Sequence, residues 1–211
     1  MHWVNIVRPD LDPFYPRKMQ FSGHEHLRTR LVLSLLSGKP LKVAGIRSQD
    51  KDPGLRGWSI FTWNSRSLLT EPLRFHHTQI LETLELSPDH EVSLLRLVEK
   101  VTNGSQIEIS PTGTSFLLRP GVMIGGPITH DCPLSRSVGY FLELVVPIAC
   151  FMKKPLVLTL RGVTTDDKDL GVDLIRTVTL PHLALFGIED GMEFKVGSSG
   201  QCQPPDSDDS V

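Results

Sequence analysis

The sequence has few cysteines, few aromatic residues and no long hydrophobic run. Its 3 cysteines, Cys132, Cys150 and Cys202, lie far apart in a chain of 211 residues. An odd number of distant cysteines argues against a disulfide framework and offers no pair at zinc-ligand spacing, so we expect a reducing compartment. No run of about 18 uncharged apolar residues is present, which excludes a membrane-spanning helix. The first residues also lack the apolar stretch of a secretory signal.

The composition is that of a globular protein with an uneven distribution of charge. Hydrophobic residues make up 39% of the chain and charged residues 22%, and the formal net charge is −2. This length suffices for one sizeable domain or two small ones. Basic residues outnumber acidic ones from Met19 to Arg56, whereas acidic residues dominate from Gly187 to Val211. The basic region suits contact with phosphate groups, although an ordinary solvated surface explains the same pattern.

Periodic apolar residues predict alternating helices and strands. Helical spacing and end signals predict helices over Leu27–Leu36, Val92–Val101, Ser135–Met152 and Asp169–Phe186. Short apolar or alternating runs predict strands over Leu41–Ile46, Gln106–Ile109, Ser115–Arg119, Leu156–Leu160 and Met192–Val196. The second and third of these strands are expected to form a hairpin, followed by a glycine-bearing loop over Gly121–Gly126. The chain is therefore expected to be α/β, with a sheet covered by helices mainly on one side.

Several of these elements carry more specific expectations. Pro147 is expected to bend its long apolar helix, and Asn103-Gly104 to end the helix before it. The strand over Leu156–Leu160 should be buried. The last helix should be amphipathic, with an apolar stripe formed by Leu170, Leu174, Val178, Pro181 and Leu185.

Three segments lie outside this pattern. Residues 1–18 are rich in Pro, Asp and Arg and are interpreted as a loose tail. Residues 57–88 mix strand-like and helix-like patches without a single period, which suits either a surface insertion or translated non-coding sequence, and the second is favoured. Residues 197–211 have the acidic, polar composition of a disordered tail. The region from 19 to 196 is left as the folded part of the chain.

Several segments, in this order, resemble a known family. They are FSGHEHLRTRLVLSLLSGKPLKVAGIR, KDPGLR, HEVSLLRLVEKVTNGSQIEIS, GTSFLLRPGVMIGGPITHDC and LRGVTTDD. The chain resembles the RNA 3′-terminal phosphate cyclases, and most of all the non-catalytic, cyclase-like branch of that family. The resemblance implies repeated units of two helices packed on a four-stranded sheet, present here as an incomplete set over residues 19–196. Residues 57–88 have no counterpart in the family pattern.

The segment Ser22–Arg28 raises the question of a nucleotide or metal site. In the active cyclases the resemblance places a glycine-rich loop there, close to the nucleotide, because a backbone that approaches phosphates must lack side chains. This chain keeps Gly23 but has His24, Glu25 and His26 at the following positions, a degenerate form of that loop. Two histidines two residues apart at a helix start diverge, which argues against a metal site. A capping box formed by Ser22 and Glu25 is the simpler interpretation.

Other residues are candidates for contact with RNA or phosphate. The guanidinium group of arginine can donate two parallel hydrogen bonds to a phosphate, and glycine-containing loops let backbone amides approach an anion. The candidates are Arg28, Arg30, Arg47, Arg119, Gly125 and Gly126. The alternative is that the arginines lie on solvated helix surface and the glycines in plain turns.

Two further clusters suggest chemistry but have simpler explanations. His130, Asp131 and Cys132 form a Cys/His combination, yet sequence neighbours rarely reach catalytic geometry, and Cys132 is expected to pack in the core. Asp166 and Asp167 follow a strand, where metals can bind, but they also suit the start of the helix expected at Asp169. No catalytic residue, metal or cofactor is assigned.

The function is inferred from the resemblance. It implies a non-catalytic component of the nucleolar machinery that processes small-subunit pre-rRNA, acting in 18S rRNA maturation and 40S subunit biogenesis. Its expected partners are pre-rRNA and a large nucleolar GTPase, and its expected location is the nucleolus. Two alternatives remain: an ATP-dependent RNA 3′-terminal phosphate cyclase, or a truncated product without function. An endonuclease role of the branch is left unassigned by this portion of sequence.

Overall fold

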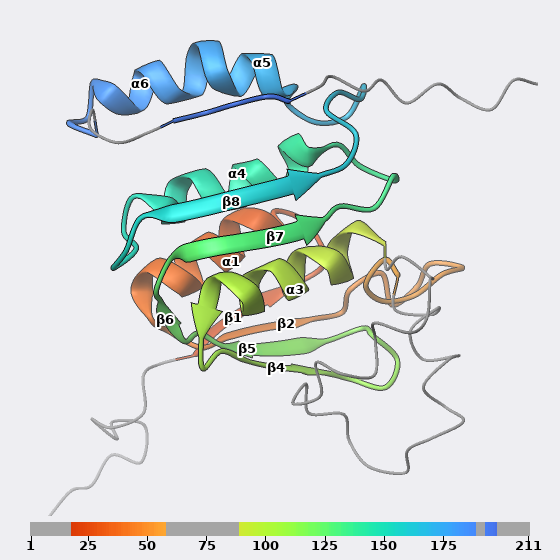
Figure 1. Ribbon diagram of the computed structural model, residues 1–211. Helices are drawn as coiled ribbons and strands as arrows, with labels where there is room; N and C mark the ends of the chain where they lie inside the picture. The colour runs from red at the N-terminus through yellow and green to blue at the C-terminus, as the bar shows by residue number, and fades with distance from the viewer. Residues whose placement is uncertain (1–17, 58–88, 189–192, 198–211) are drawn as a thin grey trace, which may run out of the picture.

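Two successive β-α-β units form the framework of the structure, a computed structural model that describes residues 18–57, 89–188 and 193–197 (Figure 1). In each unit, two parallel strands are joined by one helix, and a second helical segment follows the second strand. This repetition confirms the α/β class expected from the sequence.

The first unit consists of two helices packed on a four-stranded sheet. The sheet has the order β1-β2-β5-β4, in which β1 and β2 are parallel and the other neighbours are antiparallel. Its elements are β1 (Met19–Ser22), α1 (Leu27–Ser37), β2 (Leu41–Ala44), α3 (His90–Val101), β4 (Gln106–Ile109) and β5 (Phe116–Arg119). The unit expected from the family resemblance is therefore present, and the predicted hairpin is β4–β5.

The second unit repeats the parallel pair but not the hairpin. A short antiparallel pair of β3 (Thr102–Asn103) and β6 (Val122–Met123) precedes it. The unit itself contains β7 (Gly126–Asp131), α4 (Val138–Ala149), β8 (Leu156–Arg161), α5 (Val172–Leu174), the π-helical turn η1 (Ile175–Thr179) and α6 (Leu180–Ala184). Strands β7 and β8 form a parallel two-stranded sheet. Within the described ranges, none of these helices combines the length and apolar character needed to cross a membrane.

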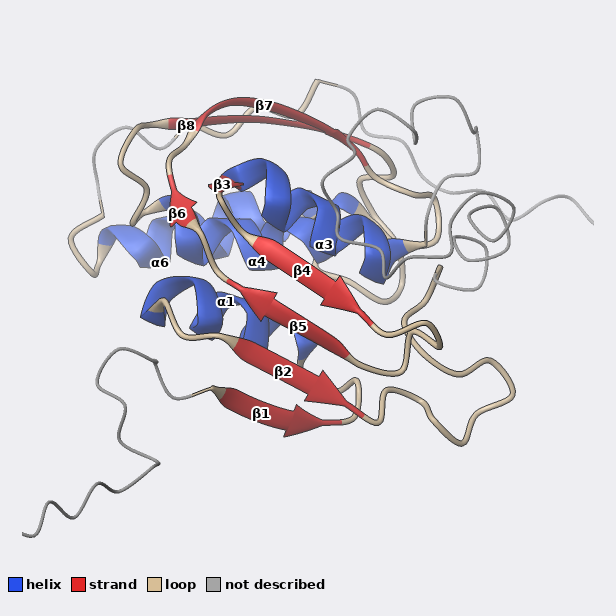
Figure 2. Cartoon of the chain, turned by 90° about the horizontal axis from the view of Figure 1, so that it is seen from below, coloured by secondary structure: helices blue, strands red, loops and turns tan. Residues whose placement is uncertain are grey.

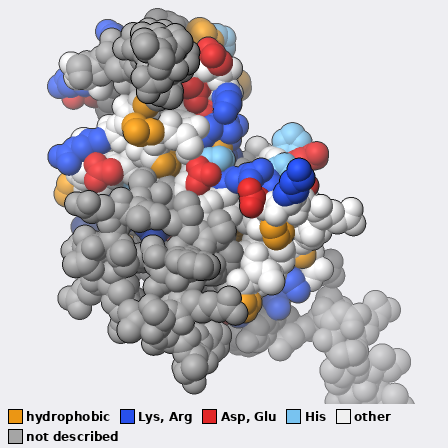
Figure 3. Space-filling model, turned by 90° about the vertical axis from the view of Figure 1, so that its right-hand side faces the viewer, with side chains coloured by type: hydrophobic (Ala, Val, Ile, Leu, Met, Phe, Trp, Pro, Cys, Tyr) orange, Lys and Arg blue, Asp and Glu red, His pale blue; other side chains and the backbone are white. Residues whose placement is uncertain are grey.

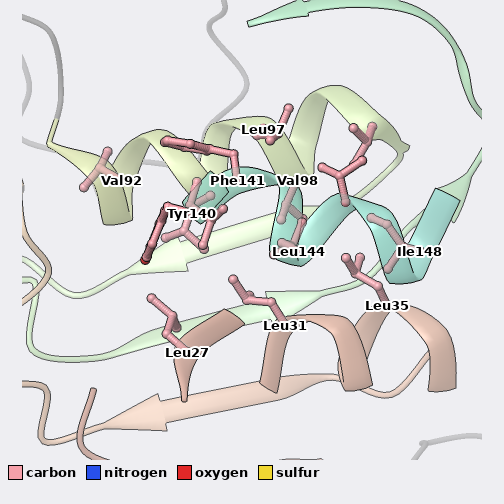
Figure 4. Packing of buried hydrophobic residues seen from close by; sticks show 14 of the residues in the cluster. Leu27, Leu31, Leu35, Val92, Leu97, Val98, Tyr140, Phe141, Leu144 and Ile148 are labelled. Carbon is pink, nitrogen blue, oxygen red and sulfur yellow. The ribbon is translucent and has the colours of Figure 1, made fainter. Parts of the chain in front are cut away.

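Three helices fill the space between the two sheets. Figure 2 shows α1, α3 and α4 between the four-stranded sheet and the β7–β8 pair. In Figure 4, Leu27, Leu31 and Leu35 on one side of α1 point toward Tyr140, Leu144 and Ile148 of α4. Burying one such leucine side chain contributes about 1.5–3 kcal/mol. The α1–α4 contact thus joins the two units through one continuous core.

Local sequence signals explain the helices α1 and α3. The leucines of α1 recur every four residues on one face, and the helix ends at Gly38, whose positive φ of 68° favours glycine. In α3, the side chain of Asp89 accepts a hydrogen bond from the amide of His90 and caps the helix. The helix ends before Asn103-Gly104, because Thr102 is already extended and pairs in β3.

The predicted capping box at the start of α1 is wrong. Ser22 lies in β1, because Met19–Ser22 pairs in parallel with β2, a long-range contact that local patterns do not reveal. The residue preceding α1 is His26, which has a left-handed φ of 54°, and no side chain caps the helix. Glu25 therefore lies in the connection between β1 and α1 rather than in the first turn.

Two predictions about the second unit are also wrong. The strand over Leu156–Leu160 is half-buried rather than buried, because side chains on alternate positions of β8 face solvent. The last helix begins at Val172 instead of Asp169 and contains a π-helical turn just before Pro181, which has no amide hydrogen to donate. Its predicted stripe is exposed: Leu174 is 47% and Leu185 80% exposed, whereas Val172 and Ile175 are buried.

The remaining helix is shorter than predicted, and some predictions lie outside the described residues. Helix α4 covers Val138–Ala149 of the expected Ser135–Met152 and includes Pro147 in its last turn. Nearly all of the tails and of the insertion at 57–88 lie outside the described ranges. Residue 192 of the predicted last strand is also outside them, and 193–197 carry no strand assignment.

Candidate functional site

Several polar side chains gather where the parallel strands end and the helices begin. The carboxyl ends of β1, β2, β7 and β8 lie on one side of the molecule, at the right in Figure 1. Figure 3 views this side and shows Lys or Arg, Asp or Glu, and His side chains close together on its uncovered part. Ligands of open α/β folds commonly bind at the carboxyl ends of strands. We call this region the strand-end face.

Two arginines from different units share one buried carboxylate on the strand-end face. Arg136 donates from Nε and Nη2 to Asp169 at 2.6 and 2.5 Å, and Arg28 Nη1 lies 3.3 Å from the same carboxylate. The side chain of Asp169 is fully buried, and Arg28 also pairs with Glu143 at 2.9 Å. Both guanidinium groups lie over the ring of Tyr140, 4.5 and 4.8 Å from its centroid. The cluster ties α1 to α4 and balances two positive charges with two negative ones.

Burial and charge partners explain the pKa shifts within this cluster. The hydrogen bonds that Arg136 donates to Asp169 raise the pKa of Arg136 above its usual range. Burial raises the pKa of the Tyr140 hydroxyl. Both residues therefore keep one protonation state through the physiological range of pH, as structural groups do.

A second buried ion pair lies beside this cluster. Arg47 Nη1 and Nη2 donate to Glu91 at 2.8 and 2.7 Å, and the amide of Arg56 donates to Glu91 at 2.7 Å. Burial would raise the pKa of Glu91, but the hydrogen bonds from Arg47 and Arg56 outweigh it and lower the pKa. Arg47 has a left-handed φ of 44°, and its Nη1 also donates to the carbonyl of Gly54. The two Nη groups of Arg47 that could donate to a phosphate are thus bound to a carboxylate.

A third network links the start of α3 to the segment before α4. The carboxylate of Asp89 accepts hydrogen bonds from the amide of His90 and from the hydroxyl of Ser135. Burial would raise the pKa of Asp89, but the hydrogen bonds from Ser135 and His90 lower it. The His90 ring packs edge-on against Tyr140, with ring centroids 5.2 Å apart. These contacts bring the three networks into one group.

The degenerate glycine loop lies at the rim of the strand-end face. Gly23 has a φ of 75°, and His24, Glu25 and His26 are exposed to solvent. Arg30 folds back over the loop and donates to the carbonyl of Gly23 at 2.8 Å. The histidines therefore project from the loop into solvent, and Arg30 acts on the backbone of its own chain.

The structure does not bring all the predicted phosphate contacts together. Arg28, Arg30 and Arg47 lie at the strand-end face. Gly125 and Gly126 lie at the opposite ends of the strands, because Gly126 and Leu156 are the first residues of the parallel β7–β8 pair. Arg119 also lies at that opposite side, because its neighbour Leu118 pairs with Leu41, the first residue of β2.

Each residue of this second group has a contact within the chain or a neighbour that restricts its side chain. Arg119 pairs with Glu108 at 2.5 Å. The amide of Gly126 donates to the carbonyl of Pro155. A Cβ on Gly125 would lie 2.1 Å from the carbonyl oxygen of Lys154, so glycine is required there for close packing.

His130 and Cys132 are both buried. Burial lowers the pKa of His130 to about 4 and raises the pKa of Cys132 to about 12, so the imidazole is neutral and the thiol protonated near neutral pH. His130 Nε2 instead pairs with the hydroxyl of Ser93 at 2.9 Å. Cys132 belongs to the hydrophobic core. This confirms the packing interpretation of Cys132.

The acidic pair after β8 does not cap the last helix. Asp166 accepts hydrogen bonds from the amides of Ser137 and Asp169, which fixes the loop against the start of α4. Asp167 is exposed. Among the described residues, no group of three or more His, Cys, Asp or Glu side chains is arranged to hold a metal ion.

Sequence reasoning missed the acids that organise the strand-end face. Glu91 and Asp169 bind arginines that are distant in the chain, with separations of 44 and 33 residues for Arg47 and Arg136. A usable signal was present at Asp89-His90-Glu91, a charged triplet directly before an apolar helix. No comparable local signal marks Asp169.

Comparisons with known proteins agree on one family. A sequence profile of the family described as RNA 3′-terminal phosphate cyclase matches residues 19–60 and 86–204. Similar proteins include a probable RNA 3′-terminal phosphate cyclase-like protein of Dictyostelium discoideum, 40% identical over 92% of this chain and 43% of that protein. The rRNA processing protein rcl1 of Schizosaccharomyces pombe is 42% identical over 87% of this chain and 42% of its own length. The human RNA 3′-terminal phosphate cyclase-like protein is 40% identical over 89% of this chain and 41% of its own length. The chain thus spans less than half the length of these curated relatives.

Proposed function

The chain belongs to the RNA 3′-terminal phosphate cyclase family, and on that premise we propose that it acts in ribosomal RNA processing without cyclising RNA ends. Relatives from Schizosaccharomyces pombe and Saccharomyces cerevisiae, 42% and 38% identical to it, are rRNA processing proteins by name. The proposed role is in the processing of small-subunit pre-rRNA, leading to 18S rRNA and the 40S subunit. Its proposed location is the nucleolus.

The charge balance of the strand-end face is the observation that carries the non-catalytic part of this proposal. Arg28, Arg47 and Arg136 are each bound to a carboxylate of the same chain. A nucleoside triphosphate needs cations or backbone amides that are free to meet its phosphates. Displacing a buried carboxylate from its arginine would leave an uncompensated charge, at a cost of about 3–5 kcal/mol. The face is therefore built to hold the two units together.

Exposure suggests an order among the predicted RNA contacts. The side chain of Arg119 is 45% exposed, that of Arg28 27% and that of Arg47 only 9%. Contact with the RNA backbone favours basic side chains that solvent can reach, because displaced counterions supply much of the affinity. We place Arg119 first among the phosphate contacts and Arg47 last. A large nucleolar GTPase and the small-subunit processing machinery are the proposed protein partners.

A chimera tests the proposed role in rRNA processing. Residues 19–196 would replace the matching segment of the Schizosaccharomyces pombe rRNA processing protein rcl1 in cells that depend on it. We expect normal 18S rRNA levels by northern blot, since the segment is the family's own structural unit. A matched chimera carrying Glu91→Ala should accumulate 18S precursors because its fold is weakened. Accumulated precursors with the unaltered chimera, at normal protein level, would contradict the proposal.

A further inference from the structure

Helices cover one side of the four-stranded sheet in the first unit. Leu41, Val43, Phe116 and Leu118 point to that side and are buried. Figure 2 shows α1, α3 and α4 all on this side of the sheet. Because side chains alternate along a strand, the residues between these four point to the opposite side. We call that side the open sheet face, and its central residues are Gln20, Lys42, Gln106, Glu108, Leu117 and Arg119.

The open sheet face is polar where the covered side is apolar. Gln20, Lys42, Gln106 and Arg119 are exposed. Leu117 is the one apolar residue among the six, and it is already half-buried. A sheet side that packs against another layer of a core carries apolar residues, as the helix side does here. The polar side is therefore suited to water or to a polar partner.

Three cations gather at the end of the open sheet face where β1 and β2 begin. Extending the register by one residue places Lys18 and Arg119 on either side of Pro40, in agreement with the hydrogen bond from the amide of Met19 to the carbonyl of Pro40. Strands lie about 4.8 Å apart, so the backbones of Lys18 and Arg119 are about 10 Å from each other. Lys42 lies in the next row, diagonal to Arg119 at about 7–8 Å.

These three positive charges are only partly balanced. Glu108 is the one acid among the six central residues, and it pairs with Arg119 at 2.5 Å. Arg119 still has 45% of its side chain exposed. Lys18 and Lys42 are exposed and form no ion pair with any residue that the structure describes. Like charges at neighbouring positions destabilise a sheet, so an anion bound here would relieve a repulsion that the chain otherwise retains.

The chemistry of the open sheet face matches an RNA backbone better than a protein surface. Protein interfaces usually have an apolar centre, and this face offers only Leu117. Interfaces with a nucleic-acid backbone are polar and positively charged. The amides of Gln20 and Gln106 can both donate and accept hydrogen bonds, which suits phosphate and ribose 2′-hydroxyl groups. The six central residues include no aromatic side chain on which unpaired bases could stack, and this favours base-paired RNA.

We propose that the open sheet face binds the sugar–phosphate backbone of base-paired RNA, with Lys18, Lys42 and Arg119 as the phosphate contacts. Gln20 lies beside Lys42 and Gln106 beside Arg119, so each supplies hydrogen bonds next to a cation. The inference rests on the proposed role in rRNA processing and names the surface through which the chain meets its RNA. Backbone contacts carry no sequence information, so binding depends on the shape of the RNA and on salt.

A binding titration with charge variants provides the test. The probe is a fluorescein-labelled RNA stem of 16 base pairs, and its binding to the full chain is followed by fluorescence anisotropy at several salt concentrations. The triple variant Lys18→Gln, Lys42→Gln and Arg119→Gln should weaken binding about ten-fold or more and lower the slope of log affinity against log salt by about 2, since each phosphate contact contributes about 0.7–0.9.

A matched control separates this face from net charge. The triple variant Lys153→Gln, Lys154→Gln and Lys168→Gln removes the same number of positive charges at exposed positions of the second unit. It should leave most of the affinity and of the salt slope unchanged. Circular dichroism confirms that both variants are folded.

Lysine footprinting locates the bound RNA on the unaltered chain. Acetylation by sulfo-N-hydroxysuccinimide acetate, read by mass spectrometry, should be slowed by the RNA stem at Lys18 and Lys42. Acetylation of Lys153, Lys154 and Lys168 should proceed at the same rate with and without RNA.

Four results would overturn the proposal. They are no saturable binding of the RNA stem at low salt, equal losses in the two triple variants, tighter binding of the unpaired strand than of the stem, and tighter binding of a polyglutamate peptide of equal charge. The last result would assign the open sheet face to an acidic protein. Normal 18S rRNA in the chimera without RNA binding at this face would overturn this inference alone and would leave the proposed function supported.

Discussion

Removal of the Glu91 carboxylate is expected to destabilise the fold severely. The side chain of Glu91 is 5% exposed and that of Arg47 9% exposed. The Glu91 carboxylate accepts hydrogen bonds from Nη1 and Nη2 of Arg47 and from the backbone amide of Arg56. Glu91→Ala leaves the guanidinium buried without a counter-charge, which costs about 3–5 kcal/mol. Against a typical total stability of about 5–15 kcal/mol, that loss is a large fraction.

Urea denaturation followed by circular dichroism measures this loss. The midpoint should fall while the slope with denaturant stays constant, because the surface exposed on unfolding is unchanged. The double variant Arg47→Met with Glu91→Leu is the control, and it should lose less stability than Glu91→Ala because no buried charge remains unpaired. A cost below about 1 kcal/mol for Glu91→Ala would refute the reasoning, since a surface pair contributes that little.

The same carboxylate gives a dependence on pH. Its pKa is lowered in the folded state, so its stabilising contribution is present above the unfolded pKa of about 4.3 and is lost as pH falls through the lower folded value. Glu91→Gln should therefore be much less stable than the unaltered chain at pH 7. The difference should narrow below about pH 4. A constant difference from pH 7 to pH 3 would contradict the ion-pair interpretation.

Three further predictions concern packing and reactivity. Gly125→Ala should destabilise the chain by about 2 kcal/mol or more in thermal unfolding, since its Cβ would meet the Lys154 carbonyl oxygen at 2.1 Å. Gly126→Ala should cost less: its φ of 104° strains an alanine, but no atom lies within 4 Å of the added Cβ, and equal effects would contradict this. Cys132 should resist iodoacetamide at pH 8, because burial raises its pKa to about 12. Mass spectrometry of the folded chain should show Cys150, which is less buried, modified before Cys132. Asp169→Asn should lower the free energy of unfolding by about 3 kcal/mol by leaving Arg28 and Arg136 without their shared charge, and a change within 0.5 kcal/mol would exclude that role.

Local signals predicted those parts of the fold that local contacts stabilise. Helices α1 and α3 and the hairpin β4–β5 follow from apolar spacing and turn residues. Strands β1 and β7 were missed, because each pairs in parallel with a strand that is separated from it by a helix, and the β7 sequence GPITHD has no regular alternation. Parallel pairing depends on the whole unit, and no short segment shows it.

The site was predicted less completely than the fold. Arginines were identified by residue type, but their partners Glu91 and Asp169 become neighbours only when the helices pack. The exposed stripe at Leu174 and Leu185 shows a related limit. Amphipathic spacing identifies the apolar face of a helix, but it does not indicate whether anything covers that face.

A titration with ATP tests most directly the claim that the strand-end face is closed by its own ion pairs. Isothermal titration calorimetry with ATP, and incubation with labelled ATP and an RNA 3′-phosphate, would be run on the folded chain and on its Arg28→Ala variant. We predict no saturable heat and no covalent AMP adduct in either protein. Saturable ATP binding or AMP transfer by the unaltered chain, lost in Arg28→Ala, would contradict the account and favour an active cyclase.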